Sequence, residues 1–211
     1  MDKTESILLG TILTLSGGFL DAYSYLIRGG VLANAITGNI VLTGLNLAQK
    51  NWERSFYCFV PVLAYAAGVF IAEWIHHKWD EHANWKEFIL WGEVLILLIA
   101  GFLPQSMNAL VNFSIAFVCA MQVEAFRKIR GKPYATTMCT GNLRSGTELL
   151  SIGFFKHDPE KKKLALHYYW IDFIFCIGVM IGYFVCQWFA EKAIWSCALL
   201  LLLSIALLKK K

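Results

Sequence analysis

The sequence predicts an all-α polytopic membrane protein, with about six transmembrane helices and two re-entrant or broken segments, built as an inverted-topology internal repeat. Three observations predict this fold. Hydrophobic residues make up 57% of the 211 residues and charged residues only 16%, whereas soluble domains are about 45–50% apolar and about a quarter charged. The apolar residues occur in runs of roughly 17–25, the length that crosses a hydrocarbon core. The tripeptide Thr-Gly-Asn occurs twice, at 37–39 and 140–142.

The two halves of the chain repeat each other in order. A shift of 103 residues superposes the two tripeptides and places Asp-Ala-Tyr at 21–23 over Glu-Ala-Phe at 124–126. A shift of 110, which allows for a longer loop, places Gly-Val-Phe-Ile at 68–71 over Gly-Val-Met-Ile at 178–181. These agreements predict a duplication, with a first repeat over residues 1–104 and a second over 105–211 in one integral-membrane domain.

The predicted elements follow from the apolar runs and the links between them. The first span covers residues 7–27, and the first Thr-Gly-Asn segment, 31–48, follows at once. Pro104 ends the third span, so that only a tight turn precedes the fourth. The second Thr-Gly-Asn segment covers 134–155 and comes after the basic stretch RKIRGK. The remaining spans are 55–77, 88–103, 108–126, 166–190 and 194–208.

The distribution of basic residues distinguishes six spans from eight, because Lys and Arg accumulate in cytoplasmic loops. If both Thr-Gly-Asn segments are re-entrant and the N-terminus is inside, 15 Lys and Arg are cytoplasmic and 4 are outside. If both segments cross, the division is 10 against 8, and Arg144 is left in the membrane. We therefore expect six spans and cytoplasmic termini, with eight spans as the alternative. Three spans per repeat is an odd number, so the second repeat would be inverted, which is a recurring transporter plan.

Each tripeptide has the composition of a helix break. Gly permits backbone angles that are closed to other residues, and Thr and Asn cap helix starts with side-chain oxygens. A helix beginning near the Asn would direct free N–H groups into a cavity, and such helix ends bind anions or polar solutes. The alternative is that each tripeptide only kinks a packed helix. The candidate substrate-binding residues here are Thr37, Gly38, Asn39, Thr140, Gly141 and Asn142.

Asp21 and Glu124 are acids late in an apolar span, at equivalent positions of the two repeats. A charge at that depth is costly, which makes both residues candidates for a proton, cation or substrate site. The alternative is a carboxylate satisfied near a helix end by Arg127 or Arg28.

Arg127 and Arg144 flank the second Thr-Gly-Asn segment. Both are candidates to attract an anionic substrate, or else to pair with Glu124 and Glu148. The first repeat has an uncharged Ser and Val at these two places. The C-terminal half would therefore recognise any charge on the substrate.

Small residues four apart, Gly68 and Ala72 in one span and Gly178 and Gly182 in the matching span, predict close helix packing.

The remaining polar residues suggest no chemistry. Glu73, Glu93 and Asp172 lie within a turn or two of span ends, which indicates interfacial positions. His76, His77 and His82 share an interfacial loop with Lys and Asp, which favours a solvated loop over a zinc site. No HExxH, G-x-S-x-G or phosphate-loop pattern occurs, so we expect no metal, no cofactor and no catalytic residue.

Two stretches carry a resemblance to a known family. They are GGFLDAYSYLIRGGVLANAITGNIVLTG at 17–44 and QVEAFRKIRGKPYATTMCTGNLRS at 122–145. With the overall length, they resemble the YoaK family of bacterial multi-pass membrane proteins, whose domain has no assigned function. The resemblance implies a bacterial inner-membrane protein with about six spans. It supplies neither a substrate nor catalytic residues.

These features favour a transporter or channel-like carrier of a small polar or anionic solute, with its site between the repeats. Its partners would be the lipid bilayer and the solute, and six spans make a small bundle compatible with a homodimer. The net charge of +4 is too small to indicate nucleic acid. Two alternatives stay open. One is a membrane enzyme for a lipid or isoprenoid-type substrate, and the other is a structural or assembly protein with a packed interior.

Overall fold

A computed structural model describes residues 3–79, 85–129 and 131–209. The α-helices are α1 (Ile7–Ile27), α2 (Ile36–Ala48), α3 (Trp52–Lys78), α4 (Trp85–Ala100), α5 (Asn108–Ala125), α6 (Cys139–Phe155), α7 (Pro159–Phe189) and α8 (Trp195–Lys209). Short 3₁₀ turns cover Lys3–Glu5, Gln105–Met107 and Ala190–Ile194, and the antiparallel strands β1 (Lys128–Ile129) and β2 (Lys132–Pro133) form a small hairpin. The prediction of an all-α chain is confirmed apart from this hairpin.

Four helical stretches are long and apolar enough to cross a membrane within the described ranges. They are Ile7–Ile27, Trp52–Lys78, Gln105–Ala125 and the continuous stretch Pro159–Lys209, which contains both α7 and α8. Helix α2 is apolar but shorter, with 13 residues. The apolar runs therefore form helices, several of them long enough to cross a membrane, and α4, with 16 residues, is not among these four stretches.

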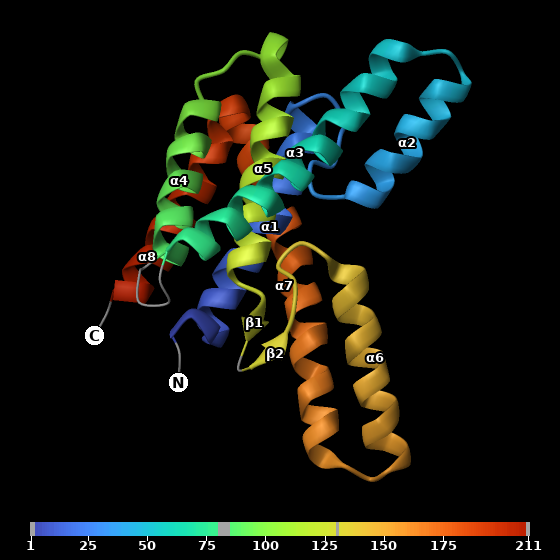
Figure 1. Cartoon of the computed structure of the whole chain (residues 1–211), viewed down its shortest axis with the longest axis vertical. Coiled ribbons are helices and arrows are strands. Elements are labelled where there is room, and N and C mark those ends of the chain that lie inside the picture. The colour runs from blue at the N-terminus through green and yellow to red at the C-terminus, as the bar shows by residue number, and fades with distance from the viewer. Residues whose placement is uncertain (1–2, 80–84, 130, 210–211) are drawn as a thin grey trace.

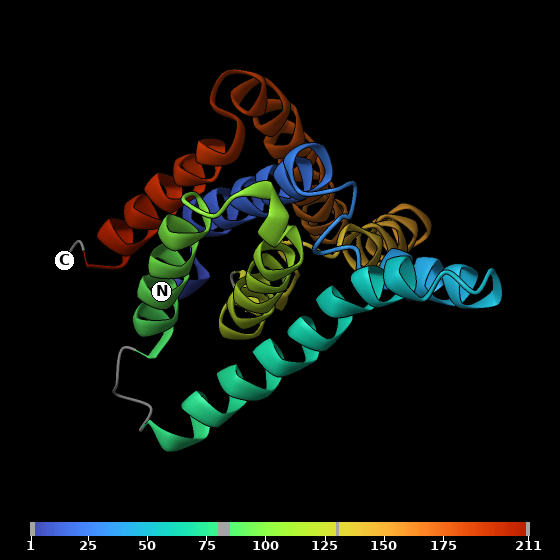
Figure 2. The same ribbon diagram turned by 90° about the horizontal axis from the view of Figure 1, so that it is seen from above.

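The helices pack in pairs that match between the two halves of the chain. Helix α1 packs against α7 and α8, α5 packs against α3 and α4, and α4 packs against α8. Helix α2 lies along α3, and α6 lies along α7. Figures 1 and 2 show these two helix pairs projecting from the same side of the bundle, one above the other. Exchanging α1–α4 for α5–α8 leaves these main pairs unchanged, because α1·α7 becomes α5·α3 and α2·α3 becomes α6·α7.

The crossings that join the two halves depend on small residues. A Cβ on Gly178 of α7 would overlap the backbone of Leu15 in α1, and a Cβ on Gly68 of α3 would overlap that of Phe117 in α5. A Cβ on Gly182 would lie 2.9 Å from the Cβ of Ala22. Such contacts let two helix backbones approach closely, which stabilises helix pairs in lipid. The prediction of close helix packing at these glycines is confirmed.

The pairs α2–α3 and α6–α7 are joined by the same turn. Lys50 and His157 each follow the end of the first helix with a positive φ, 57° and 53°. Asn51 and Asp158 come next, and their side chains accept hydrogen bonds from backbone N–H groups in the first turn of α3 and α7. These positions are N-cap positions, at which Asn and Asp are favoured.

The position of these turns corrects the expectation of a longer loop in the second repeat. The helix starts Ile36 and Cys139 are 103 residues apart, the turn residues Lys50 and His157 are 107 apart, and Gly68 and Gly178 are 110 apart. The extra residues therefore lie in α6, which has four more residues than α2, and in the first half of α7. The second helix pair is about one helical turn longer, at about 3.6 residues a turn.

Two predicted boundaries are wrong for a local reason. The sequence places the start of the fifth span at residue 166, yet α7 begins at Pro159, because Asp158 caps the helix and Pro is favoured in its first turn. Helices α2 and α6 each begin three residues before the expected starts at Asn39 and Asn142. The Thr-Gly-Asn tripeptides thus lie inside the first turns, and the chain breaks ahead of them.

The two ends of the molecule are formed by different turns and links. In Figure 1 both termini, the β1–β2 hairpin and the α6–α7 turn lie towards the lower end, and the α2–α3 turn and the α4–α5 link lie at the upper end. Helices α2 and α6 start near the middle and run to opposite ends.

Candidate functional site

The starts of α2 and α6 lie at half the depth of the bundle. Gly17 is the middle residue of α1, and a Cβ there would lie 2.7 Å from Cγ2 of Thr137 and 3.1 Å from the carbonyl oxygen of Thr136. Both threonines lie in the loop before α6, which starts at Cys139 after Met138. The loop before α6 therefore crosses α1 at its midpoint, where a spanning helix reaches the centre of the membrane.

Asn39 and Asn142 make the same hydrogen bond in the two halves. The side-chain nitrogen of Asn39 donates to the carbonyl oxygen of Leu32 at 2.9 Å, and that of Asn142 donates to the carbonyl oxygen of Ala135 at 2.8 Å. Each acceptor lies seven residues before its donor, and the shift of 103 relates both. The shared Asn therefore holds the loop that precedes each helix, a role that neither sequence interpretation anticipated.

Asp21 holds the other end of the first loop. Its side chain is 7% exposed, and Oδ1 accepts from the backbone N–H of Asn34 at 2.9 Å. Ser24 of α1 accepts from the N–H of Ala33 at 3.1 Å. Asp21 does not form the ion pair with Arg28 that was the alternative, because the guanidinium of Arg28 donates to other groups. These are the hydroxyl of Tyr23, the carbonyls of Ala100 and Leu103, and the side-chain oxygen of Asn108.

Asp172 of α7 contacts Asn142, which holds the loop before α6. The sequence analysis placed Asp172 near a span end, and this prediction is wrong. The side chain of Asn142 donates to Oδ1 of Asp172 at 3.2 Å, and Cys139 lies in electrostatic range of this carboxylate. Because α7 starts seven residues earlier than expected, Asp172 lies near the middle of the helix instead of at its entry. An acid in the middle of a span is the signal that would have found it.

Glu93 is also misplaced by the sequence interpretation. It is the ninth of 16 residues in α4, its side chain is 1% exposed, and neither carboxylate oxygen has a hydrogen-bond partner among the described residues. It lies in the core of the bundle, in electrostatic range of Cys119 of α5 and Cys197 of α8. It is therefore a buried acid and not an interfacial one.

The second equivalent acid, Glu124, has a different environment from Asp21. Arg127 forms ion pairs with Glu124 and with Glu73 of α3. Glu73 also faces His76 and His77, and His82 lies outside the described residues. The predicted alternative, a carboxylate satisfied by Arg127, describes Glu124 as the structure shows it.

The remaining predicted residues lie on the outer faces of the two half-length helices. Thr37 and Gly38 on α2, and Thr140 and Gly141 on α6, are exposed or nearly so, as is Arg144 two residues beyond Asn142. A Cβ on Gly141 would meet nothing within 4 Å. The described glycines with positive φ are Gly29, Gly30 and Gly131. The prediction that the tripeptide glycines supply unusual backbone angles is therefore wrong, and their effect is to leave the helix starts uncovered.

Buried and half-buried polar residues gather around the two loops, where Asp21 of α1 lies in electrostatic range of Cys139 at the start of α6. Gln122 of α5 donates to the hydroxyl of Thr136 at 3.1 Å, and the hydroxyl of Thr137 has no partner among the residues described. Buried polar groups are usually hydrogen-bonded, so an unpaired hydroxyl at half depth marks a place where water or a polar ligand fits. The cluster consists of Asp21, Asn34, Gln122, Thr136, Thr137, Cys139, Asn142 and Asp172.

Comparison with known proteins identifies the family. A sequence model for proteins described as "protein of unknown function (DUF1275)" matches residues 9–207. The chain belongs to the DUF1275 family. It is also similar to the UPF0700 transmembrane protein YoaK of Bacillus subtilis (strain 168), with 26% identity over 189 residues that cover 81% of this chain and 80% of the relative. No solved structure matches.

Membership of the DUF1275 family confirms the resemblance to the YoaK family that the two quoted stretches carry. The relative is named a transmembrane protein, and this chain has several apolar helices of spanning length. The DUF1275 chain described here is therefore a helical multi-pass membrane protein, with a buried polar cluster at half the depth of its bundle.

Proposed function

We propose that the protein is a carrier for a small polar solute, which binds where α2 and α6 begin. The observation that carries this proposal is the pair of half-length helices. They start at half depth from equivalent hydrogen-bonded loops and run to opposite ends of the bundle. Interrupted backbone at membrane depth is tolerated only where protein or a water-filled cavity receives it. Discontinuous helices of this kind hold the substrate in many secondary transporters.

The same helices support an inverted repeat with six spans. Helix α2, with 13 residues, reaches only about 20 Å at 1.5 Å per residue, against a hydrocarbon core of about 30 Å. Helix α6 is about as short as α4, and what separates the two is position, because the loop before α6 crosses α1 beside its middle residue, Gly17. In this proposal α1, α3, α4, α5, α7 and α8 cross, and the 3₁₀ turn before α8 extends that crossing from Ala190 to Lys209. The end that holds both termini and the α6–α7 turn is cytoplasmic, because it carries most of the Lys and Arg, and the membrane is the bacterial inner membrane.

The chemistry of the site favours a solute with both hydrogen-bond donors and acceptors. The carboxylates of Asp21 and Asp172 suit a cationic or donor group, and the N–H groups at the starts of α2 and α6 suit an acceptor or anionic group. Arg144, exposed on α6 near Asn142, is the residue we propose for a negatively charged part of the solute. Arg127 already forms ion pairs with Glu124 and Glu73, so its role is to hold α5 against α3. The outer faces of α2 and α6 are open, and a homodimer would cover them.

The site predicts a transport phenotype for Asn142→Leu and Asp172→Asn. The protein is reconstituted in liposomes, and uptake is screened over a library of labelled amino acids, amines, carboxylates and sugars. We expect each substitution to slow uptake of the transported solute by about 10-fold or more, because hydrogen bonds to charged groups contribute about 1.5–3 kcal/mol. The asparagine in Asp172→Asn keeps a side-chain oxygen that can accept the hydrogen bond from Asn142, so the loop before α6 stays held. A slower uptake by this variant therefore measures the loss of the negative charge.

Asn46→Leu is the matched control for this measurement. Asn46 also lies on α2, and its side chain donates to the carbonyl of Leu42 one turn back, at 2.7 Å on the exposed face. Uptake by this variant should stay within about twofold of the native rate. A transported solute whose uptake is unchanged by both Asn142→Leu and Asp172→Asn contradicts the site. The absence of uptake for every solute class in the library contradicts the carrier.

The inverted arrangement predicts opposite labelling of the two turns. Single cysteines replace Lys50 and His157 in a chain whose more exposed Cys139 and Cys176 are changed to serine, with the buried cysteines retained. We expect a membrane-impermeant maleimide to label position 50 in intact spheroplasts and position 157 only after the membrane is opened. Labelling of both positions from the same side would rule out six spans with an inverted second half.

A further inference from the structure

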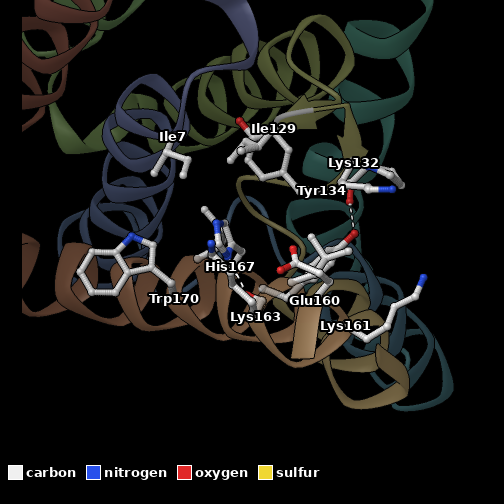
Figure 3. Close-up of a pocket in the computed structure, with 13 residues that line it drawn as sticks. Ile7, Ile129, Lys132, Tyr134, Glu160, Lys161, Lys163, His167 and Trp170 are labelled. Carbon is white, nitrogen blue, oxygen red and sulfur yellow. Dashed lines mark hydrogen bonds between the residues drawn. The ribbon is translucent and has the colours of Figure 1, made fainter. Parts of the chain in front are cut away.

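A second polar site lies away from the central cluster, at the end of the bundle that holds the termini. It is a pocket of about 370 Å³ between the start of α1, the β1–β2 hairpin and the first turns of α7. Figure 3 shows its lining, with Ile7 and Trp170 towards one end and Lys132 and Glu160 towards the other. The pocket shares no lining residue with the central cluster.

One end of the pocket is cationic. Lys132 comes from β2, and Lys161 and Lys163 come from the first turns of α7. Glu160 lies at the same end, but none of the three ammonium groups forms an ion pair with a carboxylate of the described residues. Three cations against one acid leave an excess positive charge for a bound anion to neutralise.

The other end of the pocket is apolar. Ile7 of α1 and Trp170 and Ile171 of α7 line it, and Trp170 remains 47% exposed. The change occurs along α7 itself, because the charged residues of its first turns give way to apolar ones from Leu164 onward. The charged first turns of α7 thus place the cationic end of the pocket at headgroup level, and Trp170, six residues beyond Leu164, lies about 9 Å deeper, towards the hydrocarbon.

Hydrogen bonds fix the walls of the pocket before any ligand binds. The hydroxyl of Tyr168 donates to the carbonyl of Pro133 at 2.7 Å, which ties the hairpin to α7. Nδ1 of His167 hydrogen-bonds to the carbonyl of Lys163 at 2.8 Å, which holds the imidazole against the preceding turn of α7. Burial raises the pKa of Tyr134, so its hydroxyl stays neutral at the inner wall. A preformed pocket costs less ordering when it binds a ligand.

We propose that this pocket binds the headgroup of an anionic glycerophospholipid, with the phosphate between Lys132 and Lys163 and the acyl chains along Ile7 and Trp170. Basic pockets between membrane helices on the cytoplasmic side bind anionic lipid headgroups in this way. A soluble phosphate ester would use the cationic end alone and leave the apolar end empty. The proposal does not depend on the carrier function, because the two sites share no residue.

The test compares lipid binding to the whole chain in nanodiscs. The purified protein is exchanged into phosphatidylcholine nanodiscs with increasing phosphatidylglycerol, and bound lipid is counted by native mass spectrometry alongside the melting temperature. We expect one phosphatidylglycerol to be retained and to raise the melting temperature. In Lys132→Gln/Lys163→Gln its affinity should fall about 10- to 30-fold, because each lysine near anionic lipid contributes about a factor of five.

Lys128→Gln/Lys156→Gln is the matched control, since both lysines are exposed at the same end and neither lines the pocket. This variant loses the same charge and should retain phosphatidylglycerol with native affinity. An equal loss of affinity in the two double variants would overturn the proposal, since it would show a diffuse surface effect. Equal retention of phosphatidylcholine and phosphatidylglycerol by the native chain would also overturn it. Displacement of the lipid by millimolar glycerol phosphate would show an anion site that does not use the apolar end.

Discussion

Replacing Arg28 by leucine is expected to lower the free energy of unfolding by about 3–5 kcal/mol, the largest loss among single polar substitutions in this chain. The side chain of Arg28 is 0% exposed. Its Nε donates to the hydroxyl of Tyr23 at 2.8 Å, Nη2 to the carbonyl of Ala100 at 3.1 Å, and Nη1 to the carbonyl of Leu103 at 2.9 Å and to Asn108. The guanidinium thus satisfies carbonyls at the C-terminal end of α4, where a positive charge is favoured.

The cost of this substitution comes from the groups that Arg28 leaves behind. Leucine fills part of the volume but removes the side-chain donor to the carbonyl of Leu103 and one of two partners of the Ala100 carbonyl and of the Tyr23 hydroxyl. A buried polar group that loses its partner costs about 1–3 kcal/mol. The connection between the end of α1 and the link from α4 to α5 is lost with these hydrogen bonds. Thermal unfolding in mild detergent, followed by size-exclusion chromatography, measures the effect.

Arg54→Leu provides the control for Arg28→Leu. Arg54 also donates to a carbonyl, that of Gly29 at 3.2 Å, but its guanidinium lies at the surface. Its replacement should cost under about 1 kcal/mol, because an exposed group regains water. If Arg28→Leu proves no less stable than Arg54→Leu, the buried network does not stabilise the fold.

Arg28 also shows what the sequence could not predict. It follows an apolar span and precedes two glycines, a pattern typical of a solvated loop. Its burial depends on carbonyl acceptors that lie 72 and 75 residues later in the chain. A local pattern holds no information about such partners. Glu93 and Asp172 were misplaced for a related reason, since predicted span limits shifted by a few residues turn the middle of a helix into its end.

The features that the sequence predicted well are those with local or periodic causes. The apolar runs predicted the membrane helices, and the spacing of Gly68 with Ala72 and Gly178 with Gly182 predicted helix packing. The repeated tripeptide identified two elements that do make equivalent hydrogen bonds through Asn39 and Asn142. The position of the chain break was not predictable from composition, because the loops before α2 and α6 are held by Asp21, Ser24 and Asp172, which belong to other helices.

The second large effect is expected at the crossing of α1 and α7. Gly178→Leu should prevent these helices from packing, because even a Cβ at this position would overlap the backbone of Leu15. Overpacking costs about 1–3 kcal/mol for small additions and more when the overlapped atom is backbone that cannot move aside. Gly178→Ala should therefore already destabilise by about 1–3 kcal/mol, and Gly178→Leu should leave little folded protein. Gly68→Ala should behave similarly, since its Cβ would overlap the backbone of Phe117.

Gly92→Ala and Gly92→Leu separate this overlap from the general effects of replacing a helical glycine. Gly92 lies in α4, and a Cβ there would meet nothing within 4 Å. Both substitutions at Gly92 should be neutral or stabilising, because alanine and leucine favour helix over glycine by about 0.8–1 kcal/mol.

The crossings of α1 with α7 and of α3 with α5 both join the first half of the chain to the second, so loss of either one would separate the loops that hold Asn39 and Asn142. Melting of Gly178→Ala at the temperature of Gly92→Ala would show that the halves do not depend on this contact, and the polar cluster would then have to be held together by α4 and α8.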